Sequence, residues 1–476
     1  MSALIVASRA QTYGISADVD VNIAQVIGHE LLKGGELYTE LWDHRPPLTY
    51  IVTAGSELLT GWGPAQILLI GVLLSLASLV GIWHAGRVLG PVAGVTAAAF
   101  WTCFESDIAL QAHHPNGEAF VNAAVIWGAA FLVRGSTRWG PAVSWLLATL
   151  SKSNAIVFPA AFALALLSGA RDRGRAVRDV GVWLAVGAVG WLLVLAWFGA
   201  QGRLQHFWEA VVAYPQYYRG DAFENILRGM SPPLVFNRVM FALLPAAFMT
   251  AAAFLLRPSQ PLGEYLAAGI LAAWIGIILP GQFFAHYYQL YMPFFALGGG
   301  WTTGLVFQRS RTRGLFTAIA ALSASILIQV PNLFANDAAR IWTAFPTNAD
   351  RFFAEDEVMP VLFDSLRPGE SLYHIGTQSA YYIRTQTSPP VGVFFFKHMC
   401  RSWPNPRRLE NPAAGRLTEM TMSRLQRDPP GIIVLDSLYA SYCPEHPIFS
   451  WLDENYVERP ELGAGPRAQF YTRREE

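Results

Sequence analysis

Apolar residues concentrate in ten segments between residues 66 and 332, and short polar or basic connections separate them. The segments are 66–86, 91–107, 118–133, 140–151, 153–169, 181–200, 239–256, 265–281, 289–307 and 314–332. A helix that crosses a bilayer needs about 20 mostly apolar residues, and somewhat fewer when flanking side chains reach the interface. The pattern therefore predicts a polytopic α-helical membrane protein with about ten spans in this chain.

One pair of these segments allows two interpretations. Segment 140–151 is short, and the polar stretch 151–154, which contains Lys152, separates it from 153–169. Two short spans and a single broken, re-entrant element both fit this pattern.

The composition changes after Pro331, where short apolar and aromatic runs alternate with turn residues. The expected elements are strands at 368–376, 431–436 and 469–474 and an amphipathic helix at 410–427. We therefore expect a transmembrane domain at 1–333, followed by a small α/β domain at 334–476. The expected role of the second domain is a cap that stabilises the protein or docks an acceptor, without chemistry of its own.

Arginine residues set the expected orientation of the spans. They gather in every second connection, at Arg87, Arg134, Arg138, Arg171, Arg173, Arg175, Arg178, Arg257, Arg309, Arg311 and Arg313. By the positive-inside rule these connections are cytoplasmic. The other polar segments then face outward, namely 18–65, 108–117, 201–238 and the region after 333.

This orientation also puts the N-terminus outside. Residues 1–15 are too few to span a bilayer, and Arg9 and Gln11 make them polar. We expect that the chain either starts outside or lacks most of a first span that ended near Ala7, and the second interpretation is favoured.

Composition agrees with a membrane protein. Of the 476 residues, 53% are hydrophobic and 14% are charged, whereas about 25% of an average soluble domain is charged. The formal net charge is zero, so nothing indicates a nucleic-acid partner. Cys400 and Cys443 both lie in the C-terminal polar region and could form a disulfide if this region is outside the cytosol.

Candidate chemistry begins in the segment 18–65. Asp18 and Asp20 stand sixteen and fourteen positions before a Gly-Gly turn that begins at Gly34, and the motif Asp-His-Arg-Pro-Pro occupies residues 43–47. Charged groups held against a bilayer are costly unless they bind or react with something. This segment is therefore the first place where we expect function.

The order of these residues resembles the first extracytoplasmic loop of the GT-C glycosyltransferases. It is similar in particular to the bacterial branch related to protein O-mannosyltransferases and the lipid A aminoarabinose transferase. The polar break at Lys152, the sequence His286-Tyr287-Tyr288 before Pro293 and the C-terminal outer domain extend the resemblance over most of the chain. The resemblance implies a GT-C-like fold and a sugar donor linked to polyprenyl phosphate.

In that family the acid at the start of the loop is a catalytic base, and Asp20 holds its position. The resemblance implies that this carboxylate deprotonates an acceptor hydroxyl, which attacks the anomeric carbon with inversion. A positioned base accelerates such a step roughly 10²–10⁴-fold. The family usually has two adjacent acids, whereas Val21 follows Asp20 here and the second acid is Asp18. Asp18 is therefore a second candidate for the base, and a helix N-cap is the alternative role for either residue.

Two further acidic positions are candidates. Asp43, His44 and Arg45 are expected to support the site, because the following prolines stiffen the chain and relatives keep this segment beside the active site. An interfacial anchor that meets lipid headgroups is the alternative for Arg45.

Glu118 lies at the outer mouth of a predicted span and is expected to assist catalysis or to bind the acceptor. Its alternative role is a carboxylate at the start of a helix, where the helix dipole favours a negative charge. A metal site at the neighbouring His113 and His114 is the weaker interpretation.

Departure of a lipid phosphate needs cations or hydrogen-bond donors that stabilise its charge. The candidates for this role are Lys152, Arg219, His286 and Tyr287. Lys152 resembles the donor-phosphate lysine of the family, and snorkelling to the interface is its alternative. Tyr217 and Tyr218 are expected to be interfacial anchors.

The sequence thus favours a glycosyltransferase in the bacterial cytoplasmic membrane, with its active site on the outer face. The acceptor would be a lipid, a glycan or a protein, and neither it nor the sugar can be named from the sequence. No convincing metal-ligand set is present. A divalent metal is therefore possible but has no clear ligands in the sequence, and metal dependence stays open. A polymerase or ligase that uses diphosphate-linked sugars, with an arginine-rich 201–238 loop, and a lipid-linked sugar transporter are the alternatives.

Overall fold

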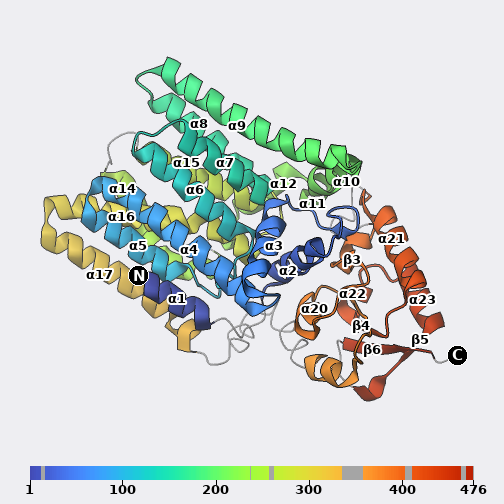
Figure 1. Cartoon of the computed structure of the whole chain (residues 1–476). Helices are drawn as coiled ribbons and strands as arrows, with labels where there is room; N and C mark the ends of the chain where they lie inside the picture. Colours follow the sequence, from blue (N-terminus) through green and yellow to red (C-terminus); the bar gives the residue numbers. More distant parts are fainter. Residues whose placement is uncertain are drawn as a thin grey trace.

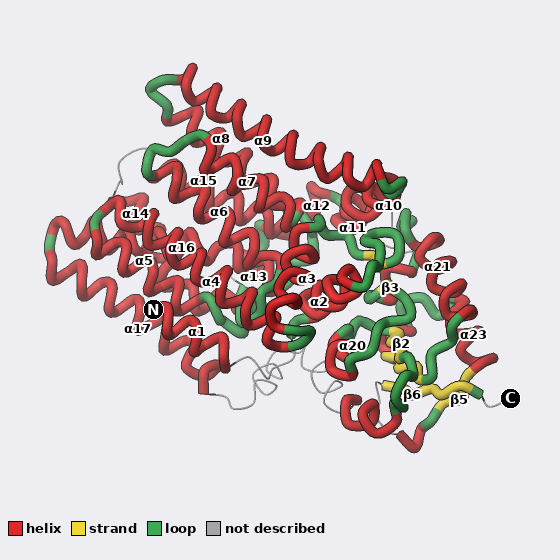
Figure 2. The backbone as a smooth tube through the Cα atoms, viewed as in Figure 1, coloured by secondary structure: helices red, strands yellow, loops and turns green. Residues whose placement is uncertain are grey.

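Helices make up most of the molecule (Figure 2). The computed structural model describes residues 1–11, 17–235, 237–256, 262–334, 358–401, 410–462 and 468–474. A bundle of long apolar helices forms the larger part, and the C-terminal part with its strands lies beside it, at the right of Figure 1. Arg257 and the start of the expected C-terminal domain lie outside the described residues.

Every one of the ten expected apolar segments coincides with a helix. These helices are α4 (Pro64–Gly86), α5 (Pro91–Phe104), α6 (Gly117–Val133), α7 (Trp139–Ser151), α8 (Val157–Gly169), α9 (Arg173–Ala200), α14 (Leu244–Leu256), α15 (Leu262–Ile278), α16 (Met292–Arg309) and α17 (Arg311–Phe334). Short 3-10 turns precede or follow some of them: η1 (Arg87–Leu89), η2 (Ser153–Ile156), η4 (Arg238–Leu243) and η5 (Ala285–Tyr291). The break between α7 and α8 is real, because Lys152 has an extended backbone between α7 and η2.

Small residues let these helices pack closely. Helix α16 crosses α5 at Gly300, where an added Cβ atom would lie 2.5 Å from the Ala93 carbonyl oxygen and from the Ala97 Cβ. Helices in lipid gain little from hydrophobic burial and associate through such close contacts. A larger residue at Gly300 would separate the two helices.

Within the described ranges, four helices are long and apolar enough to cross a membrane. They are Pro64–Leu89, Arg173–Ala200, Arg238–Leu256 and Arg311–Gln329, and four other apolar helices are shorter. Helix α9 lies along the outer edge of the bundle (Figure 1), and only 6% of its apolar window is buried. Its exposed leucine and tryptophan side chains fit contact with lipid. The expected number of about ten spans stays a prediction.

The N-terminal residues form a short helix that is tied into the bundle. Helix α1 (Ser2–Gln11) packs against α4, and its Arg9 is buried. The Arg9 Nε donates to Glu105 Oε2 at 2.7 Å, and Nη2 donates to Ser75 Oγ at 2.8 Å. The charges of Arg9 and Glu105 are both buried and compensate each other. Arg9, which makes a span by residues 1–15 unfavourable, therefore holds α1 against the bundle.

The connections on one side of the bundle contain further short elements. They are α2 (Val19–Leu32), β1 (Leu41–Trp42) and α3 (Leu48–Thr60) before α4, and α10 (Leu204–Trp208), η3 (Glu209–Ala213), α11 (Tyr214–Arg219), α12 (Ala222–Gly229) and α13 (Pro232–Val235) after α9. The arginine-rich α8–α9 and α16–α17 connections lie at the other end, away from the C-terminal part (Figure 1).

The C-terminal part contains a four-stranded sheet in the order β2-β4-β6-β5. Its strands are β2 (Leu372–Ile375), β4 (Ile432–Asp436), β5 (Tyr456–Glu458) and β6 (Ala468–Arg473), and its other elements are α20 (Ala380–Thr385), β3 (Gly392–Val393), η6 (Phe396–Met399), α21 (Ala414–Arg427), α22 (Ser437–Ala440), α23 (Pro447–Asn455) and η7 (Pro460–Leu462). Strands β2 and β4 are parallel, and the other pairs are antiparallel. The three expected strands and the amphipathic helix are present, whereas the short β5, with two exposed residues, was not expected.

A pair of hydrogen-bonded strands and an ion pair join the C-terminal part to the first loop. Strands β1 and β3 form a two-stranded parallel sheet, in which Leu41 pairs with Gly392. A Cβ atom at Gly392 would collide with the Glu40 backbone, so only glycine fits there. Arg424 Nη2 bonds to Glu40 Oε1 at 2.5 Å. These contacts pack the two parts against each other. The expected domain boundary at 333/334 stays a prediction.

Candidate functional site

A cavity of about 950 Å³ opens where the bundle, the first loop and the C-terminal part meet. Its lining comes from the start of α2, the loop after β1, the α7–η2 junction, the end of α11, the turn before η5, and the region of η6 and α22. A cavity of this size is large enough for a small molecule. Residues as far apart in the sequence as Asp18 and Tyr442 therefore line the same cavity.

Asp20 lies in this wall and is paired with two basic groups. Its Oδ1 accepts from Arg45 Nη2 at 2.6 Å, and its Oδ2 lies 3.7 Å from His286 Nε2. The side chain is 22% exposed, so it remains open to the cavity. Asp18 is the N-cap of α2, and its Oδ1 accepts from the Asp20 backbone N–H at 3.0 Å. The two acids thus differ in position, one facing Arg45 and one capping the helix.

Arg45 joins the two acids of the first loop. Its Nη1 donates to Asp43 Oδ2 at 2.6 Å while Nη2 bonds to Asp20. The Tyr38 hydroxyl donates to the Arg45 carbonyl oxygen at 2.7 Å, and Tyr38 has a positive φ of 68°. Such a strained backbone persists only where its surroundings fix it. Arg45 is therefore held inside the site, and the alternative of a lipid-headgroup anchor is wrong for this side chain.

The neighbours of each carboxylate set its charge state. Burial would raise the pKa of the Asp20 carboxyl, but Arg45 and His286 outweigh it and lower the pKa to about 2. Burial and then the Asp20 charge raise the pKa of Asp18 above its usual 3.8. Burial raises the pKa of Asp43, but Arg45 and His44 stabilise the charged carboxylate more strongly, so its pKa is well below the usual value. Asp20 and Asp43 are consequently ionised at neutral pH.

The low pKa of Asp20 predicts a pH-dependent contribution to stability. Its pKa falls from 3.8 to about 2 on folding, so the Asp20–Arg45 pair should contribute about 2 kcal/mol. A lowered pKa gives stability that is present above pH 3.8 and is lost as the pH falls toward 2. Thermal unfolding of the wild type and of Asp20→Asn in detergent should differ at pH 5 and converge by about pH 2. A difference that does not change with pH would contradict the pairing.

Glu118 lies behind the cavity wall and forms an ion pair with Lys152, which is part of the wall. Glu118, at the start of α6, is 1% exposed, while Lys152 lines the cavity. The Lys152 Nζ also lies 4.3 Å from the centre of the Tyr287 ring, which is a cation–π contact. The fold thus brings together three residues that the sequence proposes separately. Glu118 faces Lys152 and is not a lining residue.

His286 is oriented by the loop that precedes α6. Its Nδ1 lies 2.9 Å from Gln111 Oε1, and its Nε2 faces Asp20. Gln111 has a positive φ of 54°, so the loop supports this contact in a strained conformation. His286 and Tyr287 both line the cavity, as their proposed contact with the donor requires.

Two tyrosines of the aromatic run in α11, Tyr214 and Tyr217, are buried, contrary to the expectation for Tyr217. Tyr217 is 3% exposed, and its hydroxyl donates to the Arg401 carbonyl oxygen at 3.4 Å. Tyr218 lines the cavity, with its ring 5.4 Å from that of His44. The prediction of an interfacial anchor is wrong for Tyr217, because its hydroxyl is bonded to the C-terminal part and its ring is buried. For Tyr218 it stays a prediction. Arg219 lines the cavity and is exposed.

The C-terminal part supplies lining residues that the sequence did not indicate. Lys397, His398, Leu438 and Tyr442 all line the cavity, so this part contributes to its wall, and its expected role as a cap stays a prediction. Lys397 is one of only three lysines in the chain, and it follows three phenylalanines. A lysine directly after three phenylalanines was the only feature of the sequence that could have indicated a role for Lys397. No sequence spacing connects Lys397 to the first loop.

The described residues contain no group of three or more His, Cys, Asp and Glu side chains arranged to hold a metal ion. His113 and His114, the earlier metal candidates, are buried with their ring centres 4.2 Å apart. Burial lowers the pKa of His113 first, and His114 and Arg9 lower it further.

Comparison with solved structures identifies the fold. The structure of ArnT from Cupriavidus metallidurans bound to undecaprenyl phosphate matches with a TM-score of 0.60, 16% identity, and coverage of 98% of this chain and 97% of that chain. The same protein in the apo state matches with a TM-score of 0.59, 16% identity and the same coverage. No protein-family model and no curated protein matches this sequence. The ArnT-like GT-C fold that the first loop implied is confirmed.

Proposed function

We propose that this protein is an integral-membrane glycosyltransferase that uses a sugar linked to polyprenyl phosphate. The observation that carries this proposal is one cavity in which Asp20 faces Arg45, with Lys152 and Arg219 in the same wall. The ArnT structure that shares the fold is bound to undecaprenyl phosphate, which supports a polyprenyl lipid as the donor carrier here.

The charge of the cavity suits an anionic donor. Its described lining has two acidic side chains and five basic ones. The acidic residues are Asp18 and Asp20, and the basic residues are Arg45, Lys152, Arg219, Arg238 and Lys397. Fixed cations stabilise the charge that develops on a departing phosphate most strongly where water is scarce. We assign the phosphate to Lys152, Arg219 and Arg45, with His286 and Tyr287 as neighbouring contacts.

Asp20 acts as the base in this mechanism. It accepts the proton of the acceptor hydroxyl as the oxygen attacks the anomeric carbon and the bond to the donor phosphate breaks. The phosphate leaves with the bonding electron pair, and the anomeric configuration inverts. Arg45 lowers the proton affinity of Asp20 in the free protein. A donor phosphate that shares the Arg45 guanidinium would weaken this pair and make Asp20 a stronger base.

The cavity lies on the outer face of the membrane in this proposal. The arginine-rich connections lie at the opposite end of the bundle (Figure 1) and are cytoplasmic by the positive-inside rule. The donor lipid would enter laterally, with its chain between the helices and its sugar phosphate in the cavity. The expected location is a bacterial cytoplasmic membrane.

The two alternatives fit the cavity less well. A polymerase would use the arginines of the 201–238 loop. Arg219 and Arg238 do line the cavity, but Arg203 lies against the Phe198 ring, and Arg228 donates to the Gly281 carbonyl oxygen. A transporter would keep ionisable groups near the membrane midplane, whereas the groups described above gather at one end of the bundle.

Transfer in native membranes tests the proposal, because such membranes contain the acceptor. Membranes with the protein receive polyprenyl-monophosphate sugar labelled in the sugar, and matched membranes without it are the control. The expected result is protein-dependent transfer of label to an acceptor. Transfer only from diphosphate-linked sugar would favour a polymerase, and label that crosses the membrane still on its lipid would favour a transporter.

A further inference from the structure

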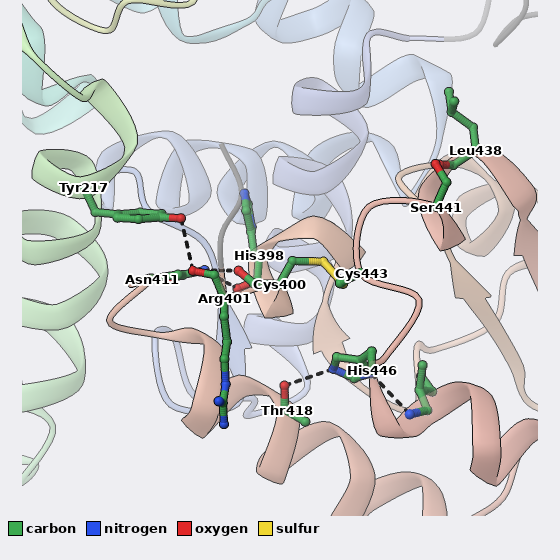
Figure 3. Close-up of a disulfide and its surroundings, with 11 residues drawn as sticks. Tyr217, His398, Cys400, Arg401, Asn411, Thr418, Leu438, Ser441, Cys443 and His446 are labelled. Carbon is green, nitrogen blue, oxygen red and sulfur yellow. Dashed lines mark hydrogen bonds between the residues drawn. A yellow bond between two sulfur atoms is a disulfide. The ribbon is translucent and has the colours of Figure 1, made fainter. Parts of the chain in front are cut away.

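Two segments of the C-terminal part form one face of the cavity, and a disulfide joins them. Lys397 and His398 line the cavity two to three positions before Cys400, and Tyr442 lines it directly before Cys443. The two cysteines are bonded, with their Cα atoms 5.7 Å apart, and both are buried. Figure 3 shows His398 and Cys400 on one segment and Cys443 on the other. The disulfide therefore sets the distance between two lining segments.

Hydrogen bonds from two other parts of the chain hold the first of these segments. Asn411 Nδ2 donates to the His398 carbonyl oxygen at 2.7 Å and to that of Cys400 at 3.2 Å (Figure 3). The Tyr217 hydroxyl, from α11, donates to the Arg401 carbonyl oxygen at 3.4 Å. Neither cysteine belongs to a strand of the four-stranded sheet. These contacts fix the cavity wall, while the sheet has its own hydrogen bonds.

The side chains of this wall suit a saccharide. His398 is buried beside the Lys397 ammonium, with its ring 5.7 Å from that of His44. Burial lowers the pKa of His398, and His44 and Lys397 lower it further, so the imidazole is neutral. The rings of Tyr218, Phe395 and Tyr442 are also in the lining. Hydroxyl groups of a sugar hydrogen-bond such groups, and its apolar face packs on aromatic rings.

The position of the wall favours the acceptor over the donor. A polyprenyl chain must come from the helix bundle, where Lys152 lines the cavity between α7 and η2. The C-terminal part lies beyond the first loop as seen from the bundle (Figure 1). Asp20 and Arg45 belong to this first loop and its helix, so they stand between the two sides. A base between donor and acceptor is the arrangement that the transfer needs.

We propose that Lys397, His398 and Tyr442 form the subsite for a saccharide acceptor, and that the Cys400–Cys443 disulfide positions it. This inference rests on the proposed function. The cysteines do not touch the acceptor; they are positioning residues that act through Lys397 and Tyr442.

The test uses native membranes that contain the full chain, with labelled polyprenyl-monophosphate sugar as donor. The variants are Lys397→Gln, the double variant Cys400→Ser/Cys443→Ser, and all three changes together. Cys103→Ser is the matched control, because Cys103 is a free cysteine in α5. Purified proteins are also tested for binding of undecaprenyl phosphate. Label is then measured in the glycan, lipid-linked saccharide and protein fractions.

Lys397→Gln and the double cysteine variant should each lower transfer about tenfold, the effect of one lost charge-assisted hydrogen bond. Undecaprenyl phosphate binding should stay within about twofold, since these residues do not touch the donor. The triple variant should lose little more than either parent, because contributions through a shared residue are not additive. Reduction of the wild type should lower transfer in the same way, and reoxidation should restore it.

Other results would overturn the inference. A parallel loss of undecaprenyl phosphate binding would assign the wall to the donor, and multiplied losses in the triple variant would make the disulfide a general stabiliser. Label found only in protein would exclude a saccharide acceptor. Wild-type membranes that transfer no label contradict the proposed function itself, whereas full transfer by Lys397→Gln contradicts this inference alone.

Discussion

Asp20→Asn should lower sugar transfer by about 10²–10⁴-fold while undecaprenyl phosphate still binds. Asparagine has nearly the same shape but cannot accept the proton of the acceptor hydroxyl. The donor cations Lys152 and Arg219 remain in the cavity wall, so the donor site should stay intact. Transfer in native membranes gives the first quantity, and binding to purified protein gives the second.

Asp18→Asn is the control for this prediction, since the two carboxylates are two positions apart and both line the cavity. Asp18 caps α2 through the Asp20 backbone N–H, and an asparagine caps a helix about as well. We therefore expect a much smaller loss of transfer. Equal losses in both variants, or a larger loss at Asp18, would reject Asp20 as the base.

Lys152→Met should give the largest loss of stability at the site. It leaves the Glu118 carboxylate, which is 1% exposed, without its partner. Breaking a buried ion pair from one side costs about 3–5 kcal/mol, because the remaining charge stays buried. Thermal unfolding of purified protein in detergent should show the loss as a clear fall in the unfolding temperature.

A double variant separates stability from function at this pair. Glu118→Gln together with Lys152→Met removes both charges and should recover most of the lost stability. Transfer should stay low in the double variant, because the cation proposed for the donor phosphate is still absent. Recovery of transfer along with stability would make the pair structural only. No recovery of stability would mean that the cost of Lys152→Met has another cause.

Local features of the fold could be predicted because hydropathy depends on neighbouring residues. The ten helices from α4 to α17 follow from continuous apolar runs, and the polar stretch around Lys152 correctly predicts the break between α7 and α8. Helix α1 was harder, because its polar Arg9 is tolerated through Ser75 and Glu105, which are 66 and 96 positions away. The burial of Tyr217 was missed for the same kind of reason, since its cover comes from the C-terminal part.

The sequence by itself determined the class of the protein, its helices and a first loop with an acid and a basic motif. These depend on composition and short spacings, which the chain carries locally. Only the tertiary structure decided that Arg45 bonds to Asp20, that Lys152 meets Glu118 and Tyr287, and that Lys397 and His398 reach the same cavity. Such pairings depend on how distant segments pack, and the energies that select them are shared among many contacts rather than carried by any one stretch of sequence.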